Sequence, residues 1–153
     1  MLTAAAVAEG MGRAGAPVAA RPEVGLPEPG VPSLGILDSG ATFRNYRRLG
    51  GLEFNDAFVL GRFEGGYRPV AESTRLAMEW IDKTDLGARC AVVATHDVFL
   101  AALLNGLGKG PFDSRTRWVG FLQGCALFER PGGGWDADYL VPDKSAWRNS
   151  FVQ

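Results

Sequence analysis

The chain has 153 residues, which is enough for one domain with a core of its own. Its 16 basic and 17 acidic residues nearly cancel, and hydrophobic residues make up 46% of the sequence. Nucleic-acid-binding and membrane-surface proteins normally carry a clustered basic excess, so we expect neither partner here. No apolar run approaches the roughly 18 residues that a membrane span needs. The composition therefore predicts a cytoplasmic protein whose two cysteines, Cys90 and Cys125, are free thiols in apolar runs.

The first quarter of the chain is rich in alanine, glycine and proline. Residues 2–14 predict a helix, and residues 18–24 could include a short strand. From residue 25 to residue 40, prolines alternate with glycines, which indicates a loop.

Residues 41–66 contain two short helical patterns separated by glycines. They predict a helical lobe that covers a core. Three arginines in the first of these patterns are expected to form a solvated face, with an anion-binding edge as the alternative: Arg44, Arg47 and Arg48.

The second half has the stronger periodicity. A helix is predicted from Pro69 to about Lys83, and a second, strongly apolar helix over residues 98–107. The apolar run 90–95 between them is typical of a strand buried on both faces of a parallel sheet. Residues 121–130 and 135–141 predict two strands of a hairpin. This order favours a three-layer α/β/α domain with a mostly parallel sheet and a C-terminal antiparallel hairpin.

The candidate chemistry lies where the predicted strand 90–95 meets the helix that follows it. Ligands of α/β proteins collect beyond the carboxyl ends of strands, and the free N–H groups of a helix start attract anions. His96 at this junction could bind a phosphate oxygen, and Asp97 beside it is a candidate general acid. The alternative is purely structural: Thr95 caps the helix, Asp97 complements the helix dipole, and His96 is a junction residue.

Residues 92–97 (Val-Val-Ala-Thr-His-Asp), with Leu-Ala-Ala-Leu-Leu at 100–104, resemble the second-histidine motif of the histidine-phosphatase superfamily. The Glu72-Ser73 pair in the helix from Pro69 is similar to the phosphoglycerate-mutase-like branch. Residues 3–12 resemble the helix of that family that begins Arg-x-x-x-Thr-Ala. The resemblance spans most of residues 2–141 and is strongest around His96.

Members of this family move or hydrolyse phosphoryl groups through a phosphohistidine. The resemblance implies a phosphomonoesterase or phosphoryl-transfer domain that acts on a small phosphorylated substrate without a metal or other cofactor. His96 matches the second histidine, a catalytic residue that binds the phosphate. The general acid matches either Asp97 or Glu28, the latter in Leu26-Pro27-Glu28, and the sequence leaves both open.

The chain departs from the family at the nucleophile. It contains one histidine, so the Arg-His-Gly motif with the attacking imidazole is absent, and the alignment at Thr3 would place the second phosphate-binding arginine just before Met1. The resemblance thus implies that residues 1–153 are a single, incomplete domain of phosphoglycerate-mutase-like fold without its N-terminal strand. Such a sheet would expose an edge that invites a homodimer.

Two other interpretations stay open. One is a catalytically silent phosphate-binding or scaffold module that has lost the nucleophile half. The other is an unrelated α/β protein in which His96 is structural. The codons upstream of Met1 would separate the first of these from an enzyme.

Overall fold

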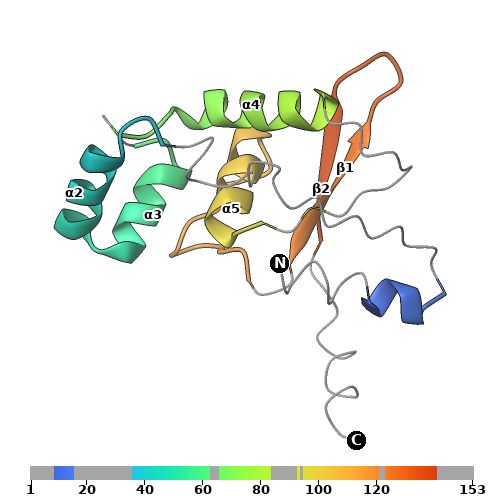
Figure 1. Ribbon diagram of the computed structural model, residues 1–153, viewed down its shortest axis with the longest axis horizontal. Coiled ribbons are helices and arrows are strands. Elements are labelled where there is room, and N and C mark those ends of the chain that lie inside the picture. Colours follow the sequence, from blue (N-terminus) through green and yellow to red (C-terminus); the bar gives the residue numbers. More distant parts are fainter. Residues whose placement is uncertain are drawn as a thin grey trace, which may run out of the picture.

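The computed structural model describes residues 9–15, 36–62, 66–83, 93, 95–120 and 123–140. A short helical turn covers residues 9–13, and the remaining described elements are four helices and a hairpin (Figure 1). Their bounds are α2 Ser39–Leu49, α3 Gly51–Val59, α4 Val70–Lys83, α5 Asp97–Gly106, β1 Gly124–Glu129 and β2 Trp135–Leu140.

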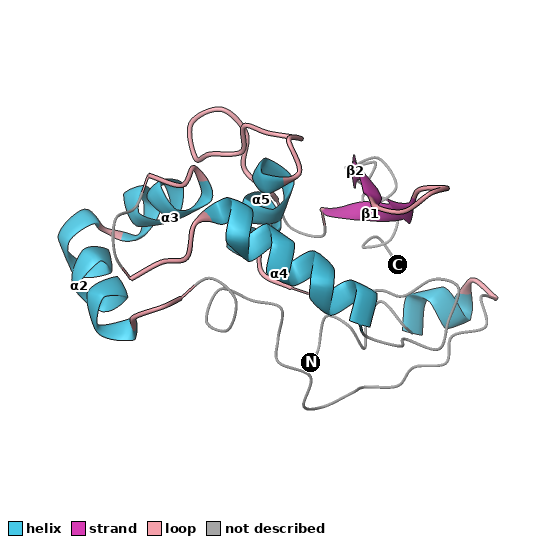
Figure 2. Ribbon diagram, turned by 90° about the horizontal axis from the view of Figure 1, so that it is seen from above, coloured by secondary structure: helices cyan, strands magenta, loops and turns pink. Residues whose placement is uncertain are grey.

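Helices α2 and α3 lie at one end of the molecule, in the stretch where the sequence predicts helical patterns (Figures 1 and 2). Asp38 is the N-cap of α2. Its Oδ1 accepts hydrogen bonds from the backbone N–H groups of Gly40 (2.8 Å) and Ala41 (3.0 Å). Gly50, at φ 78°, turns the chain sharply into α3. The Tyr46 ring packs edge-on against Phe54 of α3, with 5.2 Å between ring centroids.

The helices predicted over 69–83 and 98–107 are confirmed as α4 and α5. The two cross at a close contact between Thr74 and Gly106, where a Cβ on the glycine would lie 1.9 Å from Thr74 Oγ1. About one turn further along α4, Ala77 packs on Phe99 and Leu103 of α5. With 14 residues α4 is the longest helix in the described ranges, and none of these helices combines the length and the hydrophobicity to cross a bilayer.

Helix α5 is the centre of the core. All six residues from Phe99 to Leu104 are buried. On one side they contact the aromatic residues of α3, where Phe58 is 2% exposed, together with Tyr67. On another side they contact α4, and Cys125 of β1 packs against both clusters.

The predicted hairpin is confirmed. β1 and β2 pair in antiparallel register from Gly124 opposite Leu140 to Glu129 opposite Trp135. The turn between them contains three consecutive glycines at positive φ, a conformation that other residues adopt at a cost: Gly132, Gly133 and Gly134.

The predicted three-layer α/β/α fold with a mostly parallel sheet is wrong, and with it the phosphoglycerate-mutase-like architecture. In the described ranges the sheet has two strands, which pair antiparallel through their own turn. Of the predicted strand 90–95, Val93 and Thr95 are described and belong to no strand, and residues 90–92 and 94 lie outside the described part. The error has a physical origin. A helix that is apolar on every side, such as α5, has to be buried on every side. Among the described residues it packs mainly against helices α3 and α4.

Candidate functional site

His96 stands immediately before α5, at its N-cap position. Its backbone is extended (φ −90°, ψ 152°), and its carbonyl oxygen accepts the first hydrogen bond of the helix from the N–H of Leu100 at 3.0 Å. The N-cap residue is therefore His96. The structural alternative predicts Thr95, one residue earlier. The imidazole makes no capping hydrogen bond and is exposed. A side chain in this position can reach a ligand at the helix start.

Asp97 is the first residue of α5, and both of its carboxyl oxygens accept hydrogen bonds. Oδ1 accepts from the backbone N–H of Val98, and Oδ2 accepts from Nε1–H of Trp118, each at 2.8 Å. The negative charge also complements the positive end of the helix dipole. A general acid has to donate its proton to a leaving group, whereas Asp97 serves here as an acceptor that ties α5 to the following loop.

A hollow of about 340 Å³ opens beside Asp97, between α3, the start of α5 and the loop 111–120. Ser114 on its wall is held by Asp56 of α3, whose Oδ1 accepts the Ser114 backbone N–H at 2.7 Å and whose Oδ2 accepts the hydroxyl. Asp56 is only 9% exposed, so these two hydrogen bonds anchor the loop 111–120 to a buried side chain. The residues that line the hollow are Leu52, Asn55, Asp97, Ser114 and Trp118.

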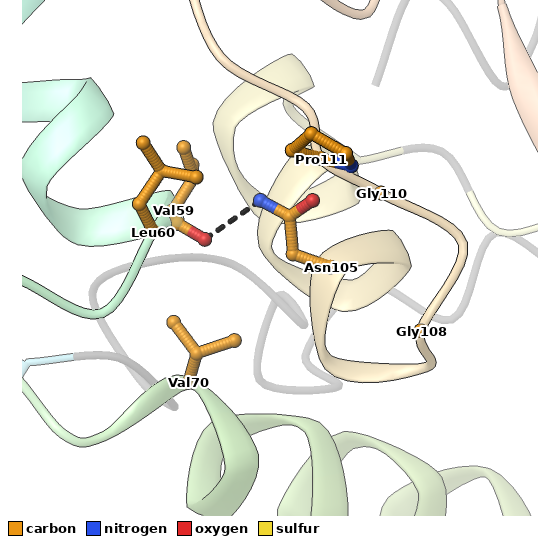
Figure 3. A pocket seen from close by; sticks show the side chains of 7 residues that line it. All are labelled: Val59, Leu60, Val70, Asn105, Gly108, Gly110 and Pro111. Carbon is orange, nitrogen blue, oxygen red and sulfur yellow. Dashed lines mark hydrogen bonds between the residues drawn. The ribbon is translucent and has the colours of Figure 1, made fainter.

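A second hollow, of about 300 Å³, lies near the other end of α5, and Figure 3 shows the side chains around it. Its one side-chain amide belongs to Asn105. Asn105 Nδ2 donates to the carbonyl oxygens of Val59 (2.7 Å) and Phe112 (3.0 Å), and its Oδ1 accepts the N–H of Phe112 at 2.7 Å. This amide joins the end of α3, α5 and the loop after α5. Because the Asn105 amide already makes three hydrogen bonds and the other lining groups are mostly apolar, few polar atoms of the second hollow are left to bind a ligand.

The other predicted site residue, Glu28, lies outside the described residues, so the structure brings together only His96 and Asp97, which are neighbours in the chain. Cys125 in β1 is a free thiol whose pKa is raised by burial, so it is a poor nucleophile. Among the residues that the structure describes, no group of three or more histidine, cysteine or acidic side chains could hold a metal ion.

The sequence does not predict that Asn55, Ser114 and Trp118 lie beside Asp97. Ser114 and Trp118 lie in a loop without periodicity, and their partners Asp56 and Asp97 are 58 and 21 residues away in the chain. No local pattern indicates such pairings. Trp118 alone carried a signal, since a tryptophan N–H in a folded protein usually finds an acceptor.

No protein-family model, curated protein or solved structure matches the chain. The resemblance to histidine phosphatases therefore rests on the residues around His96 in the sequence itself.

Proposed function

We propose that this chain binds the phosphate group of a small phosphorylated molecule at the N-terminal end of α5, with His96 as the side-chain donor. One observation carries the proposal: an exposed imidazole occupies the N-cap of a ten-residue helix without serving as its cap. The resemblance to the second-histidine motif assigns the same residue to phosphate. A helix start offers N–H donors and a positive dipole end to an anion.

The first turn of α5 supplies the backbone donors nearest to His96. The N–H of Leu100 is bonded to the His96 carbonyl, and the N–H of Val98 is bonded to Asp97. The N–H groups of Asp97 and Phe99 also belong to the first turn, where N–H groups have no acceptor inside the helix. Two backbone donors and one imidazole can hold the oxygens of one phosphate.

The Asp97 carboxylate opposes this binding, because it places a negative charge at the same helix end. We therefore expect weak affinity for inorganic phosphate. Asp97→Asn removes the charge and keeps a carbonyl oxygen that can accept from Val98 or Trp118. This variant is expected to bind phosphate more tightly than the natural chain.

His96→Ala is expected to weaken phosphate binding by about 1.5–3 kcal/mol, because a charge-assisted hydrogen bond is lost. Titration with inorganic phosphate, followed through the NMR shifts of the backbone amides of residues 97–99, measures the affinity. His96→Gln is the matched control, since it keeps an N–H donor without the imidazole, and its affinity should fall between those of the natural chain and His96→Ala. An affinity that is unchanged in His96→Ala would remove His96 from the site.

Catalysis of the histidine-phosphatase type, either hydrolysis of a phosphomonoester or phosphoryl transfer, would extend this proposal. Residues 1–153 contain a single histidine, so by themselves they would act as the alternative, a catalytically silent phosphate-binding or scaffold module. A phosphohistidine mechanism needs one imidazole to attack and separate donors to hold the phosphoryl oxygens. Asp97, which accepts hydrogen bonds at both oxygens, gives no support to a general acid at this position.

We expect residues 1–153 to show no appreciable turnover of a generic aryl phosphate, measured as release of the phenol. Sustained turnover that disappears in His96→Ala would contradict this and would make His96 the nucleophile. Turnover that survives His96→Ala would point to a different site.

The proposal includes a cytoplasmic location. The half-buried thiol of Cys125 is free, which suits a reducing compartment. Small phosphorylated molecules are also ligands that a cytoplasmic protein meets. Fractionation of cells that express the protein with a tag would test the location.

A further inference from the structure

We infer that the exposed face of α2 is a docking surface for an acidic segment of a partner protein. Helix α2 contains three arginines and no acidic residue. Arg44, Arg47 and Arg48 are spaced i, i+3 and i+4, so their side chains leave the same side of the helix, and all three are exposed. This inference is independent of the phosphate site, because neither of the two hollows described above is lined by a residue of α2.

The positive charges of this face have no ion-pair partner in the described part of the chain. The ion pairs seen there involve other basic residues, and none places a carboxylate within 4.0 Å of an α2 guanidinium. Arg48 donates to the Asn45 side chain at 3.3 Å, and Arg47 lies 5.6 Å above the Phe43 ring. Neutral neighbours thus orient Arg47 and Arg48, while Arg44 interacts with the Asp38 carboxylate at longer range than an ion pair, so the three charges stay accessible to a partner.

The position of α2 makes the face accessible. Helix α2 packs against α3 and forms the outer end of the molecule in two perpendicular views (Figures 1 and 2). Phe43, at 60% exposed, and Tyr46, at 49% exposed, add an aromatic strip along one edge of the arginines. Arginine and aromatic residues together are typical of surfaces that bind protein partners.

Charge complementarity selects an acidic protein segment as the occupant. The guanidinium fork binds a carboxylate through two parallel hydrogen bonds, and glutamates at i, i+3 and i+4 of a partner helix would match the arginine spacing. An anionic lipid surface is disfavoured, because clusters that bind anionic lipids usually hold roughly four to eight basic residues, whereas α2 has three. A nucleic acid is disfavoured because three cations neutralise few phosphates.

The test uses fluorescence anisotropy of a labelled synthetic helical peptide with glutamates at i, i+3, i+4 and i+7. We expect the full chain to bind it at low salt and to release it as salt rises. The α2 triple variant, Arg44→Gln with Arg47→Gln and Arg48→Gln, should lose affinity by roughly tenfold or more, since each exposed charge pair contributes a few-fold. Circular dichroism of the variant checks that these exposed substitutions leave the helices intact.

A matched control makes the same change of net charge elsewhere: Arg75→Gln with Arg115→Gln and Arg130→Gln, on α4, in the loop 111–120 and directly after β1. This variant is expected to bind the peptide as the natural chain does. Equal losses in both triple variants, or no peptide binding at low salt, would overturn the inference. So would binding to phosphatidylserine vesicles that only the α2 variant loses, with no binding of the peptide, since the occupant would then be a membrane surface.

Discussion

Replacement of Asn105 by alanine is expected to lower the free energy of unfolding by about 2–4 kcal/mol. The substitution removes three hydrogen bonds, those from Nδ2 to the carbonyls of Val59 and Phe112 and that from the Phe112 N–H to Oδ1. Val59 and Phe112 are each 0% exposed, so their backbone groups would stay buried without a partner. Denaturation by urea, followed by circular dichroism, measures the loss.

Asn55→Ala on α3 is the matched control, because the described structure shows no hydrogen bond for that side chain and it borders the open hollow beside Asp97. It should change stability by less than about 0.5 kcal/mol. Asn105→Asp sharpens the test, since it keeps an acceptor for Phe112 but sets a carboxylate against two carbonyl oxygens. A small effect of both Asn105 substitutions would mean that α3, α5 and the loop are not joined through this amide.

The sequence predicted the elements whose signal is local. The apolar spacing of α4, the apolar run of α5 and the glycine-rich turn between β1 and β2 all lie within a few residues of the structure they specify. The prediction of a parallel sheet was wrong because it depended on which elements pack side by side, and local sequence patterns do not specify that. A helix that is apolar on every side, like α5, is predicted to be buried, but its sequence does not specify its neighbours. In the described part of the chain these are mainly α3 and α4.

The same division applies to the candidate site. The position of His96 at the start of α5 follows from the local junction of apolar run, histidine and helix, and the structure has it at the N-cap. The role of Asp97 does not follow, because its partner Trp118 comes from a loop 21 residues further along. From the sequence, a carboxyl group next to a histidine is a candidate general acid. In the structure, the hydrogen bond from the Trp118 indole N–H makes Asp97 a link between α5 and that loop.

Gly106→Ala is expected to destabilise the protein by about 2–3 kcal/mol, against the usual trend for a helix. Alanine normally stabilises a helical position relative to glycine by roughly 0.5–1 kcal/mol. Here the new Cβ would lie 1.9 Å from Thr74 Oγ1 and 2.8 Å from Thr74 Cβ, so α4 and α5 would have to move apart. Urea denaturation of the single variant measures the effect.

The clash can be isolated with Thr74→Ala, which removes the atoms that the new Cβ would meet. Thr74 Oγ1 is buried without a hydrogen-bond partner in the described structure, so the loss of this hydroxyl alone forfeits no bond. Because the two residues are in contact, the double variant should be more stable than Gly106→Ala by at least about 1 kcal/mol, a coupling that distant residues do not show. Additive effects of the two substitutions, or a Gly106→Ala variant as stable as the natural chain, would show that α4 and α5 do not meet at this glycine.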